Sequence, residues 1–310
     1  MDSVQRIYQG SVQPANFPSL PDEWVSEWQT FPSSDGKLQL YSVIHHHKNW
    51  KGNKILVILH GFGEHGGRYL HFPHFLHSSI DAMYCLDHRG HGRSEGLRGY
   101  VEHFDVFAAD VALAMSKLYE DLTKRFGKAQ IHVLGHSMGG LILLRTLFLY
   151  PTIPFQSISV SAPLLKIKAE VPKMKKVAAL ALSKIWGSLH MASELDAQKL
   201  SHDINVVDAY IADRLVHRKI TPRFFTELLR SMADTMKRNA GITLPLQMLI
   251  PLQDAIVDSD NSLEFFRALK HRDKLLKTYP SFYHESFNEL GKERAFEDLV
   301  SWIQAHSSCS

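Results

Sequence analysis

Apolar runs and helical periods alternate along most of this chain. Residues 55–59, 82–86, 131–134 and 158–160 are short continuous apolar runs, the pattern of parallel strands buried on both faces. The segment 104–125 instead repeats its apolar residues at a helical period. Strands that alternate with helices favour right-handed crossovers and a mostly parallel sheet covered by helices on both faces. The predicted fold class is therefore α/β.

Flanking segments extend this pattern toward both ends of the chain. Segments 24–31 and 38–46 are expected to form a strand pair, because a turn that contains Asp35 and Gly36 joins them. The remaining expected strands are 244–252 and 274–279, and the remaining expected helices are 68–78, 141–150, 263–269 and 295–305.

One long interruption divides the alternating pattern. After residue 163 the strands stop, and residues 164–242 are expected to be mostly helical without a strand. Open α/β sheets bind ligands at the carboxyl ends of their strands. We therefore expect an N-terminal arm (1–22), a core built from 23–163 and 243–310, and a helical cap (164–242). The cap is inserted after the sixth strand and covers the ligand-binding end of the sheet.

The composition limits the class of protein. The chain has 310 residues, of which 45% are hydrophobic and 22% charged, and its formal net charge is +3. These values suit a soluble globular protein, and so small a charge gives no case for a nucleic-acid partner. The two cysteines, Cys85 and Cys309, form no disulfide framework. The first six residues do not resemble a signal peptide and the apolar runs are too short to span a bilayer, so we expect a cytoplasmic protein.

The segment Gly135-His136-Ser137-Met138-Gly139 carries the strongest chemical signal. It lies between an expected strand and an expected helix, which is the context that a nucleophile elbow requires. A serine on such a turn has strained backbone angles that lift its hydroxyl clear of the sheet, and the two glycines allow close passage of strand and helix. The helix N-terminus also favours developing negative charge. Ser137 is therefore the candidate nucleophile, in preference to a plain glycine-rich turn.

A serine hydroxyl needs a base to take its proton, and in folds with this elbow an acid and then a histidine follow the serine along the chain. The acid is expected just past the next sheet strand, which favours Asp254. Asp258 and Asp260 are the alternatives, although both precede an expected helix and would suit its N-cap.

The base is expected after the last strand. His284 lies in that loop, whereas His271 precedes the strand and His306 falls at the end of the last helix. His284 is therefore the candidate base, and Asp254 would hold its imidazole in one tautomer.

An oxyanion hole completes such a site. One donor is the backbone N–H after the nucleophile, that of Met138. The second is expected from the glycine-rich loop that follows the strand at 55–59, which makes the N–H of Phe62 the candidate.

Three motifs together give a family resemblance. They are His60-Gly61-Phe62-Gly63-Glu64-His65-Gly66-Gly67-Arg68-Tyr69, Asp87-His88-Arg89-Gly90-His91-Gly92-Arg93-Ser94-Glu95-Gly96 and Gly135-His136-Ser137-Met138-Gly139-Gly140. About residues 25–305 resemble the monoacylglycerol lipase and lysophospholipase branch of the α/β-hydrolases. The resemblance implies an α/β-hydrolase fold and esterase chemistry on a single acyl chain. It also implies a triad of Ser137, Asp254 and His284, with the backbone N–H groups of Phe62 and Met138 as oxyanion donors.

Two positions differ from the family pattern. The family usually has Gly three residues before the acid and three before the base, where this chain has Pro251 and Ser281. Both lie in loops that orient the triad, so the difference bears on catalytic efficiency rather than on the fold.

The expected function is that of a serine carboxylester hydrolase that cleaves monoacylglycerol into glycerol and fatty acid through an acyl-enzyme on Ser137. Lysophospholipid is the alternative substrate, and Arg214, Arg218 and Lys219 of the cap are candidates to bind its phosphate. Peptide or amide cleavage would need an anchor for an amine or side chain, which we do not find. A lipid carrier that keeps only the hydrolase fold is the more distant alternative.

A run of three histidines and a glycine-containing loop could each suggest a binding site. Adjacent strand residues point to opposite faces, so His45-His46-His47 is expected to be an exposed strand end rather than a metal site. The loop 89–93 is expected to be a tight turn near the site rather than an anion site. No zinc-type ligand spacing is present, so we expect neither a metal nor a cofactor.

The segment 173–189 of the cap has two interpretations. Its apolar residues fall on one helical face and its lysines lie off that face. The helix could touch a membrane or micelle through the apolar face, with its lysines near anionic head groups. The alternative, which we favour from the sequence, is an ordinary cap helix that buries this face over the site.

Overall fold

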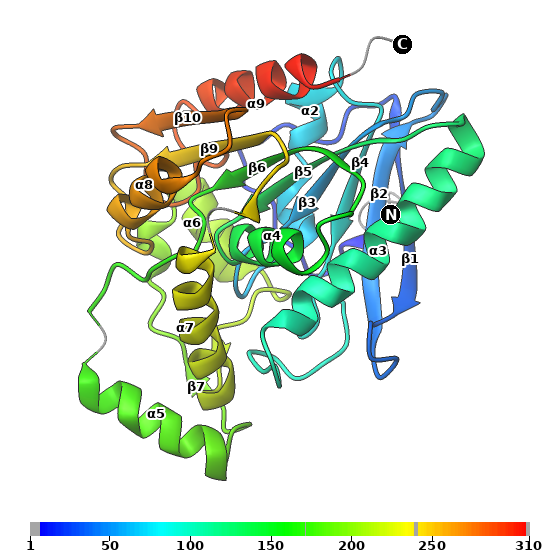
Figure 1. The fold of residues 1–310 in the computed structure, drawn as a ribbon. Helices are drawn as coiled ribbons and strands as arrows, with labels where there is room; N and C mark the ends of the chain where they lie inside the picture. Colours follow the sequence, from blue (N-terminus) through cyan, green and yellow to red (C-terminus); the bar gives the residue numbers. More distant parts are fainter. Residues whose placement is uncertain (1–6, 171, 239–240, 308–310) are drawn as a thin grey trace.

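The computed structural model describes residues 7–170, 172–238 and 241–307, and a sheet of eight strands forms its centre (Figure 1). The strand order is β1-β2-β4-β3-β5-β6-β9-β10. The strands are β1 (Trp24–Pro32), β2 (Gln39–His47), β3 (Lys54–Leu59), β4 (Ala82–Leu86), β5 (Gln130–His136), β6 (Phe155–Ser161), β9 (Leu246–Pro251) and β10 (Lys274–Tyr279). β2 pairs antiparallel with β1 and β4, and the other neighbours are parallel. The predicted α/β class is confirmed.

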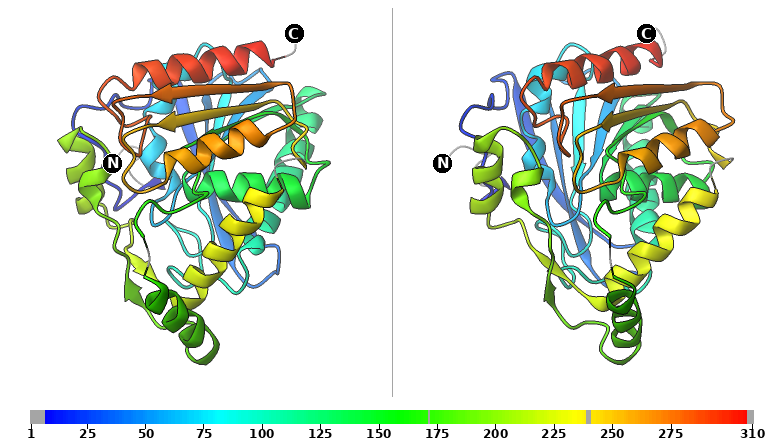
Figure 2. Two further views of the ribbon diagram at one scale, coloured as in Figure 1. Left: turned by 60° about the vertical axis from the view of Figure 1, so that its left-hand side comes forward. Right: turned by 90° about the vertical axis from the view of Figure 1, so that its left-hand side faces the viewer.

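Helices cover both faces of this sheet (Figures 1 and 2). They are α2 (Phe72–Leu76) and α9 (Glu293–Ala305) on one face, and α3 (Asp105–Phe126), α4 (Met138–Leu149) and α8 (Ser259–Ala268) on the other. Alternate residues of β3 face different cores, as the two-residue period of a strand requires. Ile55, Val57 and Leu59 pack in the cluster that contains α3 and α4. Leu56 and Ile58 pack in the cluster that contains α2 and α9.

The segment predicted as a single helix over 68–78 forms two short elements instead. These are the 3₁₀ turn η1 (Gly66–Tyr69) and α2. Pro73 lies in the first turn of α2, where a missing backbone N–H leaves no hydrogen bond unmade. The same proline inside a continuous helix would remove a bond and break it, which explains the division.

Residues 164–242 form an insertion between β6 and β9. Its elements are α5 (Lys173–Ile185), β7 (Met191–Ala192), the 3₁₀ turn η2 (Ala197–Lys199), α6 (Ile204–Ala212), β8 (Lys219–Ile220) and α7 (Pro222–Lys237). The expectation of no strand here was wrong, because β7 and β8 form an antiparallel pair of two residues each. Such a pair is too short to leave an alternating pattern in the sequence. Phe224 and Leu228 of α7 join the core cluster of α3 and α4, so this helix packs directly on the core.

The helix α5 corrects the interpretation that we favoured from the sequence. It projects from the body of the molecule, beyond α7 (Figures 1 and 2). Its apolar face is not buried over the site, since Met174 and Ile185 are each 84% exposed. The helix packs against α7 through small residues, among them Ala179 and Ser183. Small side chains give close contact with α7 but leave the larger apolar ones in solvent.

The described part of the N-terminal arm, residues 7–22, joins the core to the insertion. The hydroxyl of Tyr8 lies 3.1 Å from Nε2 of His45 in β2. The backbone N–H of Val12 donates to Asp213 at 2.9 Å, and that of Arg214 donates to the carbonyl of Gly10 at 3.0 Å.

The histidines of β2 are not the exposed strand end that we expected. His45 is fully buried and His46 is buried, because β2 lies between β1 and β4 and the arm covers it. The ring of His45 lies between the hydroxyls of Tyr8 and Ser26. Burial lowers the pKa of His45 to about 3, so its ring is neutral.

Two further expectations concern membranes and cysteines. No helix within the described residues combines the length and the apolar content needed to cross a bilayer. Cys85 is a buried free thiol in β4, and Cys309 lies outside the described residues.

Candidate active site

Ser137 stands on a sharp turn between β5 and α4. Its backbone φ of 52° and ψ of −114° lie in a strained region for a residue with a side chain. The flanking glycines are required sterically. A Cβ on Gly135 would lie 2.6 Å from the carbonyl oxygen of Gly139, and a Cβ on Gly139 would lie 1.9 Å from that of Leu59. The strand, turn and helix therefore have the geometry that the sequence motif predicts.

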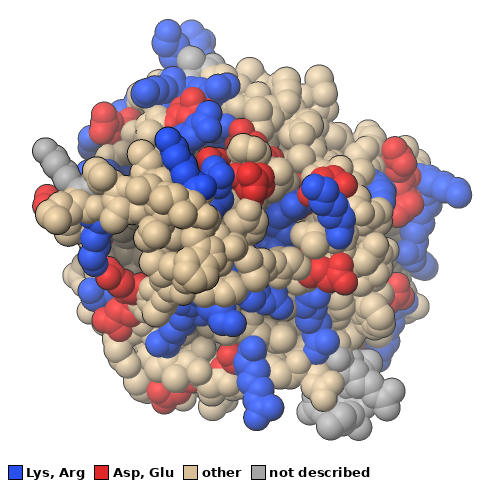
Figure 3. Space-filling view, turned by 90° about the horizontal axis from the view of Figure 1, so that it is seen from below, with Lys and Arg blue, Asp and Glu red and all other residues tan. Residues whose placement is uncertain are grey.

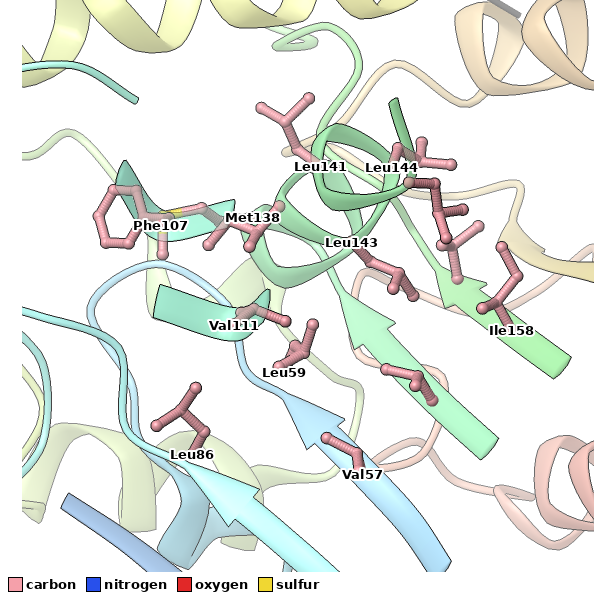
Figure 4. Close-up of a cluster of buried hydrophobic side chains, with 14 of the residues drawn as sticks. Val57, Leu59, Leu86, Phe107, Val111, Met138, Leu141, Leu143, Leu144 and Ile158 are labelled. Carbon is pink, nitrogen blue, oxygen red and sulfur yellow. The ribbon is translucent and has the colours of Figure 1, made fainter. Parts of the chain in front are cut away.

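The residue after the serine anchors this turn in the core. Met138 is fully buried, and its side chain points toward Phe107 of α3 (Figure 4). The following residues of α4, including Leu141 and Leu144, belong to the same hydrophobic cluster. Close packing behind the turn fixes the helix N-terminus from which a backbone N–H could face a developing oxyanion.

Asp254 and His284 come together from loops that follow neighbouring strands. Nδ1 of His284 lies 2.7 Å from Oδ2 of Asp254, and both side chains are buried. Oδ1 of Asp254 accepts the backbone N–H groups of Ile256 at 2.7 Å and Val257 at 2.9 Å. These bonds satisfy both carboxylate oxygens and fix the direction in which Asp254 faces the imidazole.

Burial and pairing act in opposite directions on the pKa values of this pair. Burial alone would raise the pKa of Asp254, but the charge of His284 and the hydrogen bonds to the carboxylate lower it below its ordinary value. Burial alone would lower the pKa of His284, but Asp254, followed by Glu285 and Glu64, raises it. The site therefore favours a positive charge on the imidazole, which a general base acquires during catalysis.

The ring of His136 places the turn of Ser137 next to the loop of His284, and the loop after β3 lies against that turn. The ring centroids of His136 and His284 are 4.8 Å apart, and His136 directly precedes Ser137. A Cβ on Gly61 would lie 3.3 Å from the Cβ of Ser137 and 3.3 Å from Cδ2 of His136. The glycine loop, the serine turn and the histidine loop therefore meet at one point.

The alternative acids and bases occupy other positions. Asp258 accepts the N–H of Asp260 as the N-cap of α8 and lies 2.7 Å from Nζ of Lys166. His271 precedes β10, and His306 pairs with Asp273, which also precedes that strand. Because β10 and β5 belong to the parallel part of the sheet, His271 and the pair of His306 and Asp273 lie at the edge opposite to Ser137.

The loop that contains Phe62 is held by the insertion. The carbonyl of Gly63 accepts the backbone N–H of His217 at 2.8 Å. Gly63 has a φ of 77°, and a Cβ there would lie 2.5 Å from the carbonyl oxygen of His217. The close contact requires glycine and places the predicted donor loop directly under the insertion. The ring of Phe62 also meets that of His217 edge-on, with centroids 5.5 Å apart.

The two departures from the family pattern leave the pair of Asp254 and His284 intact. Pro251 ends β9 opposite Tyr279, and its carbonyl accepts the hydroxyl of Ser259 at 2.6 Å. Ser281 is exposed in the turn that precedes His284.

The loop 89–93 is a tight turn, with Gly90 at a φ of 69° and Gly92 at 49°. The guanidinium of Arg89 donates to both oxygens of Asp110, at 2.6 and 2.8 Å, so its charge is balanced within the protein. No three His, Cys, Asp or Glu side chains in the described ranges are arranged to share a metal ion.

The structure adds buried charged residues that the sequence reasoning did not single out. Glu64 and Arg68 come from the glycine-rich loop and η1, and Glu285 directly follows His284. All three are buried and joined by hydrogen bonds of 2.6 to 2.9 Å. The presence of Glu64 and Arg68 inside the motif 60–69 was the available signal, but nothing in the sequence indicates that Arg68 pairs with a residue 217 positions away.

The chain is similar to known proteins. A sequence model of the family Hydrolase_4, described as "Serine aminopeptidase, S33", matches residues 51–291. The chain is 32% identical over 253 residues to a monoacylglycerol lipase of Mycolicibacterium smegmatis, covering 81% of this chain and 88% of that protein. It is 27% identical over 252 residues to phospholipase YtpA of Bacillus subtilis, covering 80% and 95%.

A solved structure is also similar. The crystal structure of the monoacylglycerol lipase of Paleococcus ferrophilus superposes with a TM-score of 0.73 at 26% identity, covering 91% of this chain and all of that one.

Proposed function

The chain belongs to the Hydrolase_4 family within the α/β-hydrolase superfamily, and on this premise we propose that Ser137, Asp254 and His284 form its catalytic triad. The enzyme is a serine hydrolase that acts on carboxylic esters of lipids. The observation that carries the triad is the 2.7 Å contact between Asp254 and His284 beside the strained turn of Ser137.

The geometry supports nucleophilic catalysis in two steps. Oγ of Ser137 attacks the ester carbonyl, and Nε2 of His284 accepts the serine proton and passes it to the leaving alcohol. Water then attacks the acyl-enzyme with His284 as the base, which releases the fatty acid and restores the serine. Asp254 holds Nδ1 of His284 as the protonated nitrogen, so Nε2 is left free to act.

The backbone N–H groups of Phe62 and Met138 are the proposed oxyanion donors. Met138 is the first residue of α4, where N–H groups have no partner within the helix and the helix dipole favours negative charge. Phe62 lies in the loop that contacts the Ser137 turn through Gly61. No cofactor and no metal enter this mechanism.

Monoacylglycerol is the proposed substrate, by similarity to relatives that carry that name. Lysophospholipid is the second candidate, because one relative is a phospholipase and three exposed cations lie close together in the sequence of the insertion. These are Arg214, Arg218 and Lys219. The guanidinium of Arg218 lies 6.0 Å from the ring centroid of Tyr210, whose ring is also 4.9 Å from the guanidinium of Arg68.

Substrate panels separate the two candidates. Release of fatty acid is measured from monoacylglycerols and lysophosphatidylcholines with the same acyl chains, for the wild type and Arg218→Gln. We expect higher kcat/KM on monoacylglycerol and the same ratio in the variant. A higher value on lysophosphatidylcholine that falls in Arg218→Gln would replace the first candidate by the second.

Covalent labelling separates an enzyme from a lipid carrier. A fluorophosphonate probe reacts with an activated serine, so we expect wild type to be labelled and Ser137→Ala to remain unlabelled. A folded wild-type protein that takes up no probe would contradict the triad.

We also propose that α5 contacts the surface of lipid aggregates. Large apolar side chains of this helix and its end are exposed: Met174 84%, Val177 68%, Leu180 54%, Ile185 84% and Trp186 60%. Lys175 and Lys184 are exposed beside them. Figure 3, seen from the end of the molecule at which α5 projects, shows uncharged surface bordered by Lys and Arg and, in places, by Asp and Glu. An apolar face bordered by lysines suits the surface of an anionic membrane.

Vesicle sedimentation tests the contact. The double variant Ile185→Asp with Trp186→Asp should pellet less with phosphatidylglycerol-containing vesicles than wild type, while both hydrolyse a dissolved short-chain ester equally. Equal pelleting would reject the membrane contact and leave the triad unaffected.

A further inference from the structure

We propose that Glu64, Arg68 and Glu285 form a positioning unit that joins the proposed oxyanion loop to the loop of His284 and supplies negative charge to that histidine. The inference rests on the proposed triad and adds three residues to it. None of the three is placed in contact with the reacting atoms, so each is a positioning residue rather than a catalytic one.

Arg68 is the centre of this unit. Its Nη1 donates to Oε2 of Glu64 at 2.6 Å and to Oε1 of Glu285 at 2.7 Å, and its Nη2 donates to Oε2 of Glu285 at 2.9 Å. The contact with Glu285 is therefore bidentate, the geometry in which guanidinium and carboxylate bind most strongly. Since Glu64 follows β3 and Glu285 follows β10, one side chain holds two loops that are far apart in the sequence.

Glu64 acts on the loop of the proposed oxyanion donor. Its Oε1 accepts the backbone N–H of Gly61 at 2.5 Å and the hydroxyl of Tyr69 at 2.9 Å. Gly61 directly precedes Phe62, so this bond fixes the peptide next to the proposed donor. A donor contributes most when its direction is set before the reaction, because no reorganisation is then needed in the transition state.

Glu285 acts on the loop of the proposed base. Its backbone N–H donates to the carbonyl of Leu200 in the insertion at 2.9 Å, and Oε2 accepts Nδ2 of Asn288 at 2.7 Å. Both the backbone and the side chain of Glu285 are therefore fixed by hydrogen bonds. The imidazole cannot move far while that loop remains in place.

The unit also sets the charge around His284. Two carboxylates and one guanidinium leave a net charge of −1 in a buried environment. The groups that face His284 are Asp254 from the loop after β9, His136 from the end of β5, and the unit itself. Burial lowers the pKa of His136 to about 4, so that ring is neutral. The carboxylates therefore add to Asp254 in favouring the imidazolium form.

If Arg68 only stabilised the fold, one of the two glutamates would be enough to balance its charge. A buried ion pair needs one partner for each charge, and an additional buried carboxylate costs free energy unless it is compensated. A second arginine with two carboxylates provides a matched comparison. Arg145 pairs with Asp105 at 2.7 Å and with Asp234, but these carboxylates are partly exposed and join α3 and α7 to α4.

The test compares the pH dependence of kcat/KM in Glu285→Gln, Glu64→Gln and the control Asp234→Asn. Loss of a negative charge near His284 lowers the pKa of that histidine. The acid limb of the kcat/KM profile should therefore move to lower pH by up to about half a pH unit, the size expected of one charge acting over roughly 6 to 8 Å in a water-like dielectric. We expect the shift in both glutamine variants and none in Asp234→Asn.

The kinetic constants give a second readout that a structural defect would not reproduce. Glu64→Ala removes the acceptor of the Gly61 N–H and should lower kcat about tenfold with little change in KM, because the oxyanion donor acts in the transition state. Glu64→Gln keeps an acceptor oxygen and should retain more of kcat. An unchanged acid limb in both glutamine variants, or an equal shift in Asp234→Asn, would overturn the proposal.

Fluorophosphonate labelling distinguishes this failure from failure of the triad. Wild type that is labelled while the glutamine variants keep its pH profile would reject the positioning unit alone. Wild type that is folded but not labelled would reject the triad and with it the premise of the unit.

Discussion

The helices α4 and α5 have nearly the same length, 12 and 13 residues, but opposite surroundings. All residues of α4 from Met138 to Leu147 are buried. Along α5, only Ala179 and Ser183 are buried among the side chains that the structure describes. The two helices also differ in composition, because α4 has one charged residue, Arg145, and α5 has four lysines. Large apolar residues of α5 nevertheless remain exposed, and its position relative to the sheet explains why.

Close contact with the strands explains the difference. α4 follows β5 without an intervening loop, and its glycines bring the helix against the sheet. A Cβ on Gly139 would lie 1.9 Å from the Leu59 carbonyl, and one on Gly140 would lie 3.1 Å from the Cα of Pro163. α5 instead packs against α7 alone among the helices and strands with which it makes substantial contact. α4 is thus suited to fix a nucleophile, and α5 to meet an external surface.

Catalysis gives the largest expected contrast between these two helices. Ser137→Ala, at the start of α4, should lower kcat on a dissolved short-chain ester by about 10⁶, the size found when a serine nucleophile is removed. Trp186→Ala, at the end of α5, should leave that rate within about twofold, because its side chain is 60% exposed. Comparable losses in both variants would show that α5 takes part in the chemistry. Circular dichroism verifies the fold of each variant.

Close backbone packing gives the next contrast. Gly139→Ala places a Cβ against the Leu59 carbonyl and should lower the free energy of unfolding by more than about 3 kcal/mol. Gly127→Ala, at the end of α3, is the control. It has a φ of 76° but nothing within 4 Å of the added Cβ, so only the backbone strain of about 1 to 2 kcal/mol remains. Urea unfolding measures both, and equal losses would show that the strand contact costs nothing.

Side-chain truncation tests burial itself. Leu143→Ala removes a fully buried side chain of α4 and should cost about 3 kcal/mol of unfolding free energy. Leu180→Ala removes one that is 54% exposed on α5 and should change it by about 0.5 kcal/mol at most. The same urea midpoints serve as the measurement. A loss of several kcal/mol in Leu180→Ala would mean that the α5 face is covered in solution.

The sequence was sufficient for most of the core and for the pair of Asp254 and His284. The strands at 82–86 and 274–279 have the predicted bounds, and the first of them is a continuous apolar run that leaves few alternatives. Chain order and loop position predicted that Asp254 and His284 lie close together, since loops after neighbouring parallel strands meet at one edge of the sheet. Local pattern and topology carry this information.

The surroundings of an element are not encoded in its own pattern. The period of α5 identified an apolar face but not what lies against it, and β2 gave no sign that β4 and Tyr8 would cover His45. Likewise, the contact of Arg68 with Glu285 depends on two loops that meet only in the folded chain. These features are long-range, and one sequence holds no signal for them.

The charge beside the α5 face gives the smallest expected effect. Lys184 is exposed next to Ile185 and Trp186. One lysine near an anionic membrane contributes about 1 kcal/mol, so Lys184→Gln should weaken binding to phosphatidylglycerol-containing vesicles about fivefold at low salt. The difference should disappear at about 1 M salt, where the Debye length falls to about 3 Å. The control is Lys128→Gln, which changes an exposed lysine before β5, at the opposite edge of the sheet. If both variants lose the same affinity, the net charge of the protein rather than the α5 face directs it to the membrane.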